Sequence, residues 1–180
     1  DRLANAAARL HLGERTAHWR AKADEMRETI LRRAWNPELG RFSATLDGAE
    51  MDASLLQMLD TRFVRPNDER FLATLAALET DLKRGEHVLR YADEDDFGRP
   101  ETAFNFCTFW YIEALSLVGR KEEARALFET MLARRTHAGL LSEDCDLITG
   151  APWGNYPQTY SLSGLINCAV LLSEPWSTVR

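Results

Sequence analysis

The feature that most constrains the fold of this chain is the spacing of its apolar residues, which is helical almost throughout its 180 residues. Residues 14–34, 67–84 and 120–135 carry apolar side chains at steps of three and four, with polar side chains between them. This pattern predicts surface helices that each bury one stripe. No segment has the alternating pattern of a convincing strand, so we expect an all-α protein.

Between these amphipathic segments lie three segments that are apolar on most faces, residues 52–60, 101–118 and 158–173. A helix that is hydrophobic nearly all round must be covered nearly all round, so we expect inner helices here. The order along the chain is then outer, inner, outer, inner, outer, inner, which predicts three outer–inner helical hairpins. We expect residues 1–180 to belong to a single domain, because this length can bury a core.

The links between the predicted helices differ in length. Outer-to-inner links are long, covering roughly residues 35–51, 85–100 and 136–157, whereas inner-to-outer links are short. In stacked hairpins, all links of one type lie on the same rim. Long loops in a compact domain often carry function, and these three are rich in Arg, Gly, aromatic residues and carboxylates. We therefore expect any binding or catalytic site on the long-loop rim.

Composition and charge exclude several classes of protein. The net charge is −6, and no apolar run is long enough to span a membrane. Nucleic acids and anionic membranes need a basic face, so we expect neither as a partner. The three cysteines are odd in number and scattered, which is typical of reduced thiols in a cytoplasmic protein. They are Cys107, Cys145 and Cys168.

No metal motif is present in the sequence. The acidic run at residues 93–96 lacks the spacing and the glycine of an EF-hand, so a solvated acidic loop is favoured over a cation site. The histidines have no metal-ligand spacing either; they are His11, His18, His87 and His137. We expect no metal and no cofactor.

The third long loop contains the sequence GLLSEDCDLITGAPWGNYPQ over residues 139–158. Its run GLLSE, followed by TG and then GNYPQ, resembles glycoside hydrolase family 15, whose pattern is close to GLLSEE, TG and LGNFPQ. Further motifs, in the family's order, extend the resemblance across nearly the whole chain. They are DASLL at 52–56, DER at 68–70, RY at 90–91, ETAF at 101–104, CTFW at 107–110 and GR at 119–120.

The resemblance implies a fold and a reaction. The fold is an (α/α)6 toroid, so three hairpins would form an incomplete toroid, the C-terminal half of a catalytic domain. The family hydrolyses α-glucosidic bonds with inversion, using a general acid and a general base that activates water. The motif match implies that Glu143 is the general base. The family's acid lies in a DxGIWE-like motif, which this sequence lacks.

The start of the chain agrees with this interpretation. It begins with Asp1 rather than Met, and no leader-like segment precedes the first helical pattern. We therefore expect a partial domain that works with a missing N-terminal half of the same polypeptide and is inactive alone. An incomplete ring would expose apolar surface, so we also expect the fragment to self-associate.

The resemblance also implies residues that bind sugar. Arg90 matches an arginine that binds sugar hydroxyls with its planar guanidinium, although a solvated loop arginine is the alternative. Tyr91 and Trp110 are candidates for stacking on glucose, and Trp110 suits the core equally well. Glu101 would open an inner helix, where the helix dipole alone favours a carboxylate. Trp153 stands where the family usually has Leu, and either floors a subsite or packs under the loop.

Two departures from the family pattern leave the substrate open. Leu162 stands where His is common, and Thr102 replaces Gly in the ETAF motif. We expect an α-glucoside or oligosaccharide substrate of the glucoamylase type, with a trehalase of the same family as the alternative. A scaffold of helical hairpins that binds a protein partner is the third interpretation. It accounts for the alternating helices but not for the loop around Glu143.

Overall fold

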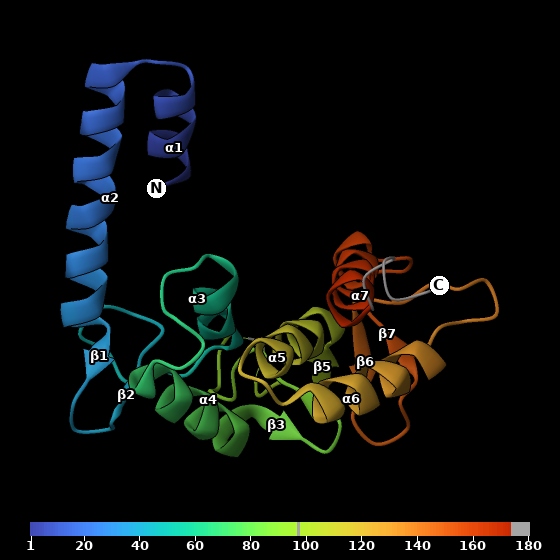
Figure 1. Cartoon of the computed structure of the whole chain (residues 1–180). Helices are drawn as coiled ribbons and strands as arrows, with labels where there is room; N and C mark the ends of the chain where they lie inside the picture. The colour runs from blue at the N-terminus through green and yellow to red at the C-terminus, as the bar shows by residue number, and fades with distance from the viewer. Residues whose placement is uncertain (97, 174–180) are drawn as a thin grey trace. The chain divides into compact units, whose positions relative to one another are not determined.

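The computed structural model describes residues 1–96 and 98–173. It divides into two compact units, residues 1–50 and 51–180 (Figure 1). The hairpin expected between residues 14–34 and 52–60 would join these units, and it stays a prediction, as does the assignment of residues 1–180 to one partial domain.

The first unit contains two helices and a short hairpin. Its elements are α1 (Arg2–Arg9), α2 (Gly13–Arg33), β1 (Trp35–Asn36) and β2 (Arg41–Phe42). Ala4 and Ala7 of α1 are buried, and α1 packs against α2. No side chain of α2 is buried in the described part of the chain, and Met26 is 63% exposed. The predicted buried stripe of this helix is therefore wrong within the unit, because the eight residues of α1 cover only part of the 21-residue α2.

The second unit contains the remaining elements. They are the 3₁₀-helix η1 (Ala53–Leu56), α3 (Gln57–Asp60), α4 (Glu69–Leu82), β3 (Lys83–Arg84), β4 (His87–Val88), β5 (Thr102–Phe104), α5 (Asn105–Leu117), α6 (Lys121–Ala133), β6 (Asp144–Asp146), β7 (Pro152–Trp153) and α7 (Thr159–Leu172). Figure 1 shows α4 and α6 in one row and α3, α5 and α7 in a second row. This arrangement agrees with the expected alternation of outer and inner helices.

The two outer helices of the second unit, α4 and α6, bury the stripes that their spacing predicts. In α4 the buried apolar residues are Phe71, Leu75, Leu78 and Leu82. Asp68 caps this helix, because its carboxylate accepts a hydrogen bond from the backbone N–H of Arg70 at 3.0 Å. In α6 the buried residues are Ala124, Phe128 and Met131. The helical period of these two segments was therefore a sound guide to their packing.

The inner helix α5 is covered on several sides, since it packs against η1, α3, α6 and α7. Gly164 of α7 allows the closest approach, because a Cβ at this position would lie 2.8 Å from Cβ of Phe109. The other face of α7 has no cover in the described chain: Ile166 is 60% exposed and Val170 is 73% exposed. Of two helices with similarly apolar sequences, α5 is central and α7 lies at an edge.

The structure corrects three sequence-based expectations. Strands are present, but each has two or three residues and lies in or beside a loop, too short to show an alternating pattern. Residues 52–60 form one turn of 3₁₀-helix followed by one turn of α-helix. The helix expected from residue 101 begins at Asn105, because residues 102–104 pair with β6 instead.

All three cysteines are unpaired and buried. None of the helices in the described residues is long and apolar enough to cross a membrane.

Candidate active site

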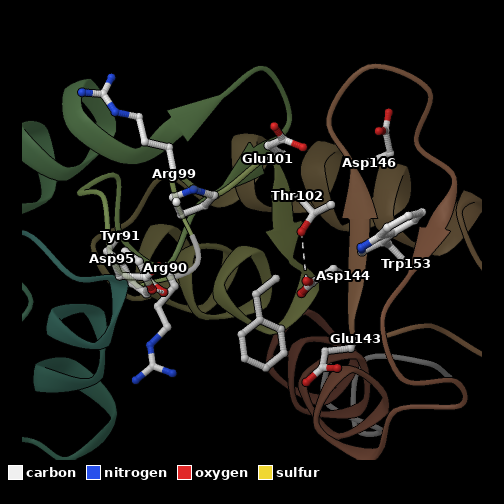
Figure 2. Close-up of a pocket in the computed structure, with 13 residues that line it drawn as sticks. Arg90, Tyr91, Asp95, Arg99, Glu101, Thr102, Glu143, Asp144, Asp146 and Trp153 are labelled. Carbon is white, nitrogen blue, oxygen red and sulfur yellow. Dashed lines mark hydrogen bonds between the residues drawn. The ribbon is translucent and has the colours of Figure 1, made fainter.

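A cavity of about 740 Å³ opens on the second unit, lined by residues of the long loops at 85–100 and 136–157 and of β5. Figure 2 shows its two sides. One side, which we call the carboxylate side, carries Glu143, Asp144, Asp146 and Trp153. The other, the arginine side, carries Arg90, Tyr91, Asp95 and Arg99.

The carboxylate side is built on a three-stranded antiparallel sheet in the order β5–β6–β7. Thr102 lies opposite Asp146, and Phe104 lies opposite Asp144. On the other edge of β6, Asp144 lies opposite Trp153. Alternate residues of β6 point to the same face, so Asp144 and Asp146 both reach the cavity, whereas Cys145 between them is buried.

Glu143 immediately precedes β6, and the starts of two helices hold its backbone. The N–H of Asn105, the first residue of α5, donates to the carbonyl of Glu143 at 3.0 Å. The preceding carbonyl, of Ser142, accepts hydrogen bonds from the Asn105 side chain at 3.0 Å and from the Ser161 hydroxyl at 2.7 Å. Asn105 and Ser161 are buried, so the position of Glu143 is coupled to the helical core.

The side chain of Glu143 is held by the segment that follows β7. Its Oε2 accepts hydrogen bonds from the backbone N–H of Asn155 at 3.1 Å and from the Asn155 side-chain Nδ2 at 2.8 Å. The Glu143 N–H in turn donates to the Asn155 carbonyl at 2.9 Å. A carboxylate fixed in this way at the wall of a cavity can accept a proton from a bound water.

Asp144 is half-buried beside Glu143. Burial raises the pKa of its carboxyl, and the nearby Glu143 charge raises it further, while a hydrogen bond from Thr102 acts in the opposite direction. The Thr102 hydroxyl donates to Asp144 Oδ2 at 3.0 Å (Figure 2). Asp144 is therefore a second carboxyl group in the cavity, with a reduced tendency to ionise.

Asp146 organises the turn between β6 and β7. Its Oδ1 accepts hydrogen bonds from the N–H of Ile148 at 3.0 Å, and from the N–H and hydroxyl of Thr149 at 2.6 and 2.8 Å. These donors, those of Thr149 above all, lower the pKa of Asp146. The TG motif at residues 149–150 thus has a structural role, which is to close this turn against Asp146.

Cys145 does not offer a nucleophile. Its Sγ lies 3.3 Å from Nδ1 of His87 in β4, and both side chains are buried. Burial raises the pKa of the thiol to about 11 and lowers the pKa of His87. Both groups are therefore neutral near pH 7, and their contact ties β6 to β4.

The arginine side is formed by the loop at residues 85–100. Arg90 Nε lies 3.5 Å from Asp52 Oδ2, with more than half of the arginine side chain exposed. The Tyr91 hydroxyl donates to Asp95 Oδ2 at 2.6 Å, and this bond raises the pKa of Tyr91. Arg99 is 3.9 Å from Glu94, and both side chains are largely exposed.

The structure brings most of the sequence-predicted site residues together. Glu143, Arg90, Tyr91, Glu101 and Trp153 all line the cavity. Glu101 is not the first residue of an inner helix, however, because it precedes strand β5, so the helix-dipole explanation for this carboxylate is wrong.

Trp110 is not among the residues that line the cavity. It lies in the second turn of α5, half-buried, with its ring centroid 4.2 Å from that of Phe106. Among the described residues, no group of three or more His, Cys, Asp or Glu side chains is placed to hold a metal ion.

The residues that support Glu143 do not follow from the sequence analysis above. Asn155 lies inside the GNYPQ motif, so a signal for it is present. Asn105 and Ser161 lie in apolar helical segments, and a polar residue near the start of such a helix is the available signal. Asp144 adjoins Glu143 in the acidic cluster of the third long loop.

The fold is similar to that of solved structures described as glycosidases. The chain matches a wild-type glycosidase with a TM-score of 0.74 at 21% identity, and a glycosidase variant in complex with glucose with a TM-score of 0.75 at 20% identity. Each match covers 87% of this chain and 44% of the solved chain. Identity at this level supports the fold alone.

Sequence comparison is more specific. Residues 1–170 match the family described as "Glycosyl hydrolases family 15", and the chain belongs to that family. The trehalase of Thermoplasma acidophilum is 35% identical over 157 residues, which are 87% of this chain and 27% of that protein. The trehalase of Mycobacterium tuberculosis is 33% identical over 173 residues, which are 94% of this chain and 25% of that protein. The chain thus spans about a quarter of the length of these relatives.

Proposed function

We propose that this chain supplies the general base and part of the sugar site of an inverting glycoside hydrolase that acts on α-glucosidic bonds. The observation that carries the proposal is the position of Glu143, whose carboxylate is fixed by Asn155 at the wall of a cavity that Arg90, Tyr91 and Trp153 also line. Membership of glycoside hydrolase family 15 supports it.

In the proposed reaction, Glu143 removes a proton from a water molecule as the water oxygen attacks the anomeric carbon. The new C–O bond forms on the face opposite the glycosidic bond, which breaks as a general acid protonates the leaving oxygen. Such an acid lies about 6.5–9.5 Å from the base in inverting enzymes. We assign the acid to an N-terminal part of the same polypeptide, outside this chain, and we refer to both parts together as the complete enzyme.

The opposite side of the cavity suits a binding role. The Arg90 guanidinium presents planar donors that match adjacent sugar hydroxyls. Tyr91 and Trp153 offer aromatic faces to the apolar face of a glucose ring, and Trp153 is 62% exposed, which leaves it free to make such a contact. Glu101 can accept hydrogen bonds from sugar hydroxyls. Trp110 stays a candidate, with its contact to Phe106 favouring a core role.

Trehalose is the substrate that the comparisons favour, because the curated relatives described above are trehalases. The sequence motifs alone favour a glucoamylase-type substrate over trehalose. The similarity to trehalases reverses this preference. An α-linked glucan is the second candidate, since the motifs around Glu143 suit any α-glucosidic bond. Hydrolysis of trehalose and of maltose by the complete enzyme separates the two.

The proposal includes the form of the complete enzyme. We propose that the three hairpins are part of an (α/α)6 toroid and that the N-terminal half completes it, so residues 1–180 alone are inactive. The exposed face of α7, with Ile166 and Val170, then makes the isolated chain self-associate, which light scattering on the wild-type chain and on a Val170→Glu variant can test. A cytoplasmic location stays a prediction.

The direct test is Glu143→Gln in the complete enzyme, with Glu129→Gln as the matched control, because Glu129 is an exposed residue of α6. We expect the first change to lower kcat by about a hundredfold to ten-thousandfold and to leave sugar binding intact. The control should retain wild-type activity. Unchanged hydrolysis in the Glu143 variant would eliminate the catalytic assignment and favour the scaffold interpretation.

A further inference from the structure

The segment after β7 and the Glu143 side chain form a closed set of hydrogen bonds. Glu143 donates its N–H to the Asn155 carbonyl at 2.9 Å, and Asn155 returns two donors to Glu143 Oε2 at 3.1 and 2.8 Å. In the described part of the chain, only Asn155 donates to this carboxylate, and both of its bonds end on the same oxygen. The two carboxylate oxygens are therefore not equivalent.

Gly154, next to Asn155, allows the backbone to pass close to Glu143. Its φ is +73°, a conformation that side chains other than glycine rarely adopt. A Cβ at this position would lie 3.0 Å from Oε2 of Glu143 and 3.2 Å from its Cβ. The backbone of residue 154 thus passes so close to Glu143 that a larger residue would displace either the turn or the carboxylate.

The turn itself is anchored at both ends. Before it, Trp153 pairs with Asp144 across β6 and β7. After it, the Gln158 N–H donates to the Leu141 carbonyl at 2.9 Å, and the Tyr156 hydroxyl lies 3.0 Å from Thr136 Oγ1. The segment around Asn155 is therefore anchored to the residues on either side of Glu143. Because Asn155 is held independently of the Glu143 side chain, it can fix the orientation of that carboxylate.

We propose that Asn155, together with Gly154, is the positioning element of the catalytic base. Both of its donors bond to Oε2 of Glu143. Oε1 is then the oxygen that accepts the proton from water. Asn155 is not among the residues that line the cavity, so it acts through Glu143. This inference rests on the proposed function, because it supposes that Glu143 is the base; the hydrogen-bond contact itself does not depend on any activity.

The kinetic test uses Asn155→Ala and Asn155→Leu in the complete enzyme. Both remove the side-chain donor without adding a charge, and the second keeps a branched side chain if the smaller residue impairs folding. We expect kcat to fall about tenfold to a hundredfold, with KM changed by less than about threefold, because the loss affects orientation of the base and not substrate binding. A rise in KM at unchanged kcat, or no change in either, would overturn the inference.

Gly154→Ala provides the second variant, with Gly139→Ala as its matched control. Gly139 also has a positive φ, of +78°, but a Cβ there would have no atom within 4 Å. Backbone strain is common to both changes, so only displacement of Glu143 distinguishes them. We expect kcat to fall for Gly154→Ala and to stay near the wild-type value for Gly139→Ala. Equal losses would show that strain alone is responsible.

Hydrogen exchange separates this inference from the proposed function. In a peptide covering residues 153–158, Glu143→Ala should speed exchange of the Asn155 amide, because its acceptor is gone, whereas Glu143→Gln retains an acceptor and should preserve protection. Unchanged exchange in Glu143→Ala would overturn the positioning role whatever the activity. Faster exchange combined with full activity of Glu143→Gln would instead reject the catalytic role and leave the contact standing.

Discussion

The two sides of the cavity are built in different ways. On the carboxylate side, Glu143 and Asp144 are held by a three-stranded sheet and by the starts of α5 and α7. On the arginine side, Arg90 has an ion pair to Asp52 at 3.5 Å, and Arg99 is largely exposed. Groups that take part in bond breaking benefit from a preorganised position, whereas groups that bind adjust to the ligand. The difference predicts that changes on the first side lower kcat and changes on the second raise KM.

Arg90→Ala tests the arginine side and should have the largest effect of the predictions below. Removing a charged donor to sugar hydroxyls should raise KM by about tenfold to a hundredfold, with a smaller change in kcat. Steady-state kinetics of the complete enzyme measure both constants. Arg99→Ala is the comparison, because its largely exposed side chain should matter far less. A fall in kcat without a change in KM would mean that Arg90 acts in the chemical step. It would contradict the division into a binding side and a catalytic side.

Thr102→Val tests the support of the carboxylate side. The change keeps the shape of the side chain and removes the hydroxyl that donates to Asp144 at 3.0 Å. We expect kcat to fall by about twofold to tenfold at constant KM, since Asp144 borders Glu143. Thr130→Val on α6 is the matched control, because that hydroxyl donates to the carbonyl of Ala126 within the same helix. If Thr102→Val raised KM alone, Asp144 would belong to the binding side.

Asp144 and Asp146 lie two residues apart on β6, and their contributions to folding stability should change in opposite directions as the pH rises. For Asp144 the pKa is raised in the folded protein, so its ionisation on raising the pH through that pKa opposes folding. Asp144→Asn should therefore increase the thermal midpoint at neutral pH, and the gain should vanish under acidic conditions where Asp144 is protonated in both states. Thermal unfolding at a series of pH values measures this. A variant less stable than the wild type at neutral pH would contradict it.

For Asp146 the pKa is lowered by the donors of the 147–150 turn. Its contribution to stability is therefore present at neutral pH and is lost as the pH falls through the folded-state pKa. Asp146→Asn should lower the thermal midpoint slightly at neutral pH and have no effect in acid. The effect should be the smallest in this series, because the side chain is partly exposed and solvent screens its charge. A midpoint that fell equally at all pH values would point to lost packing instead.

Much of the second unit could be predicted from the sequence, because the governing rule is local. The buried stripe of α4 follows from the period of Phe71, Leu75 and Leu78 alone. Glu143 and Arg90 could be placed on a common rim because the long links alternate with short ones. These inferences need only periodicity and chain order.

The remaining features depend on contacts between distant segments. Residues 102–104 look helical in isolation, and they become a strand because they pair with β6, residues 144–146. The role of Asn155 depends on the β6–β7 turn that brings it back to Glu143. The stripe of α2 could be recognised, but not whether α1 is long enough to cover it.

The central claim, that Glu143 acts as a base on water and not as a nucleophile, is tested most directly by the anomer that the complete enzyme first releases. Proton NMR of the anomeric region during the first minutes of trehalose hydrolysis, before mutarotation, measures it. Inversion converts one of the two α-linked glucose units to β-glucose and leaves the other as α-glucose, so we predict equal amounts of the two anomers. Release of α-glucose alone would show retention and would contradict the account.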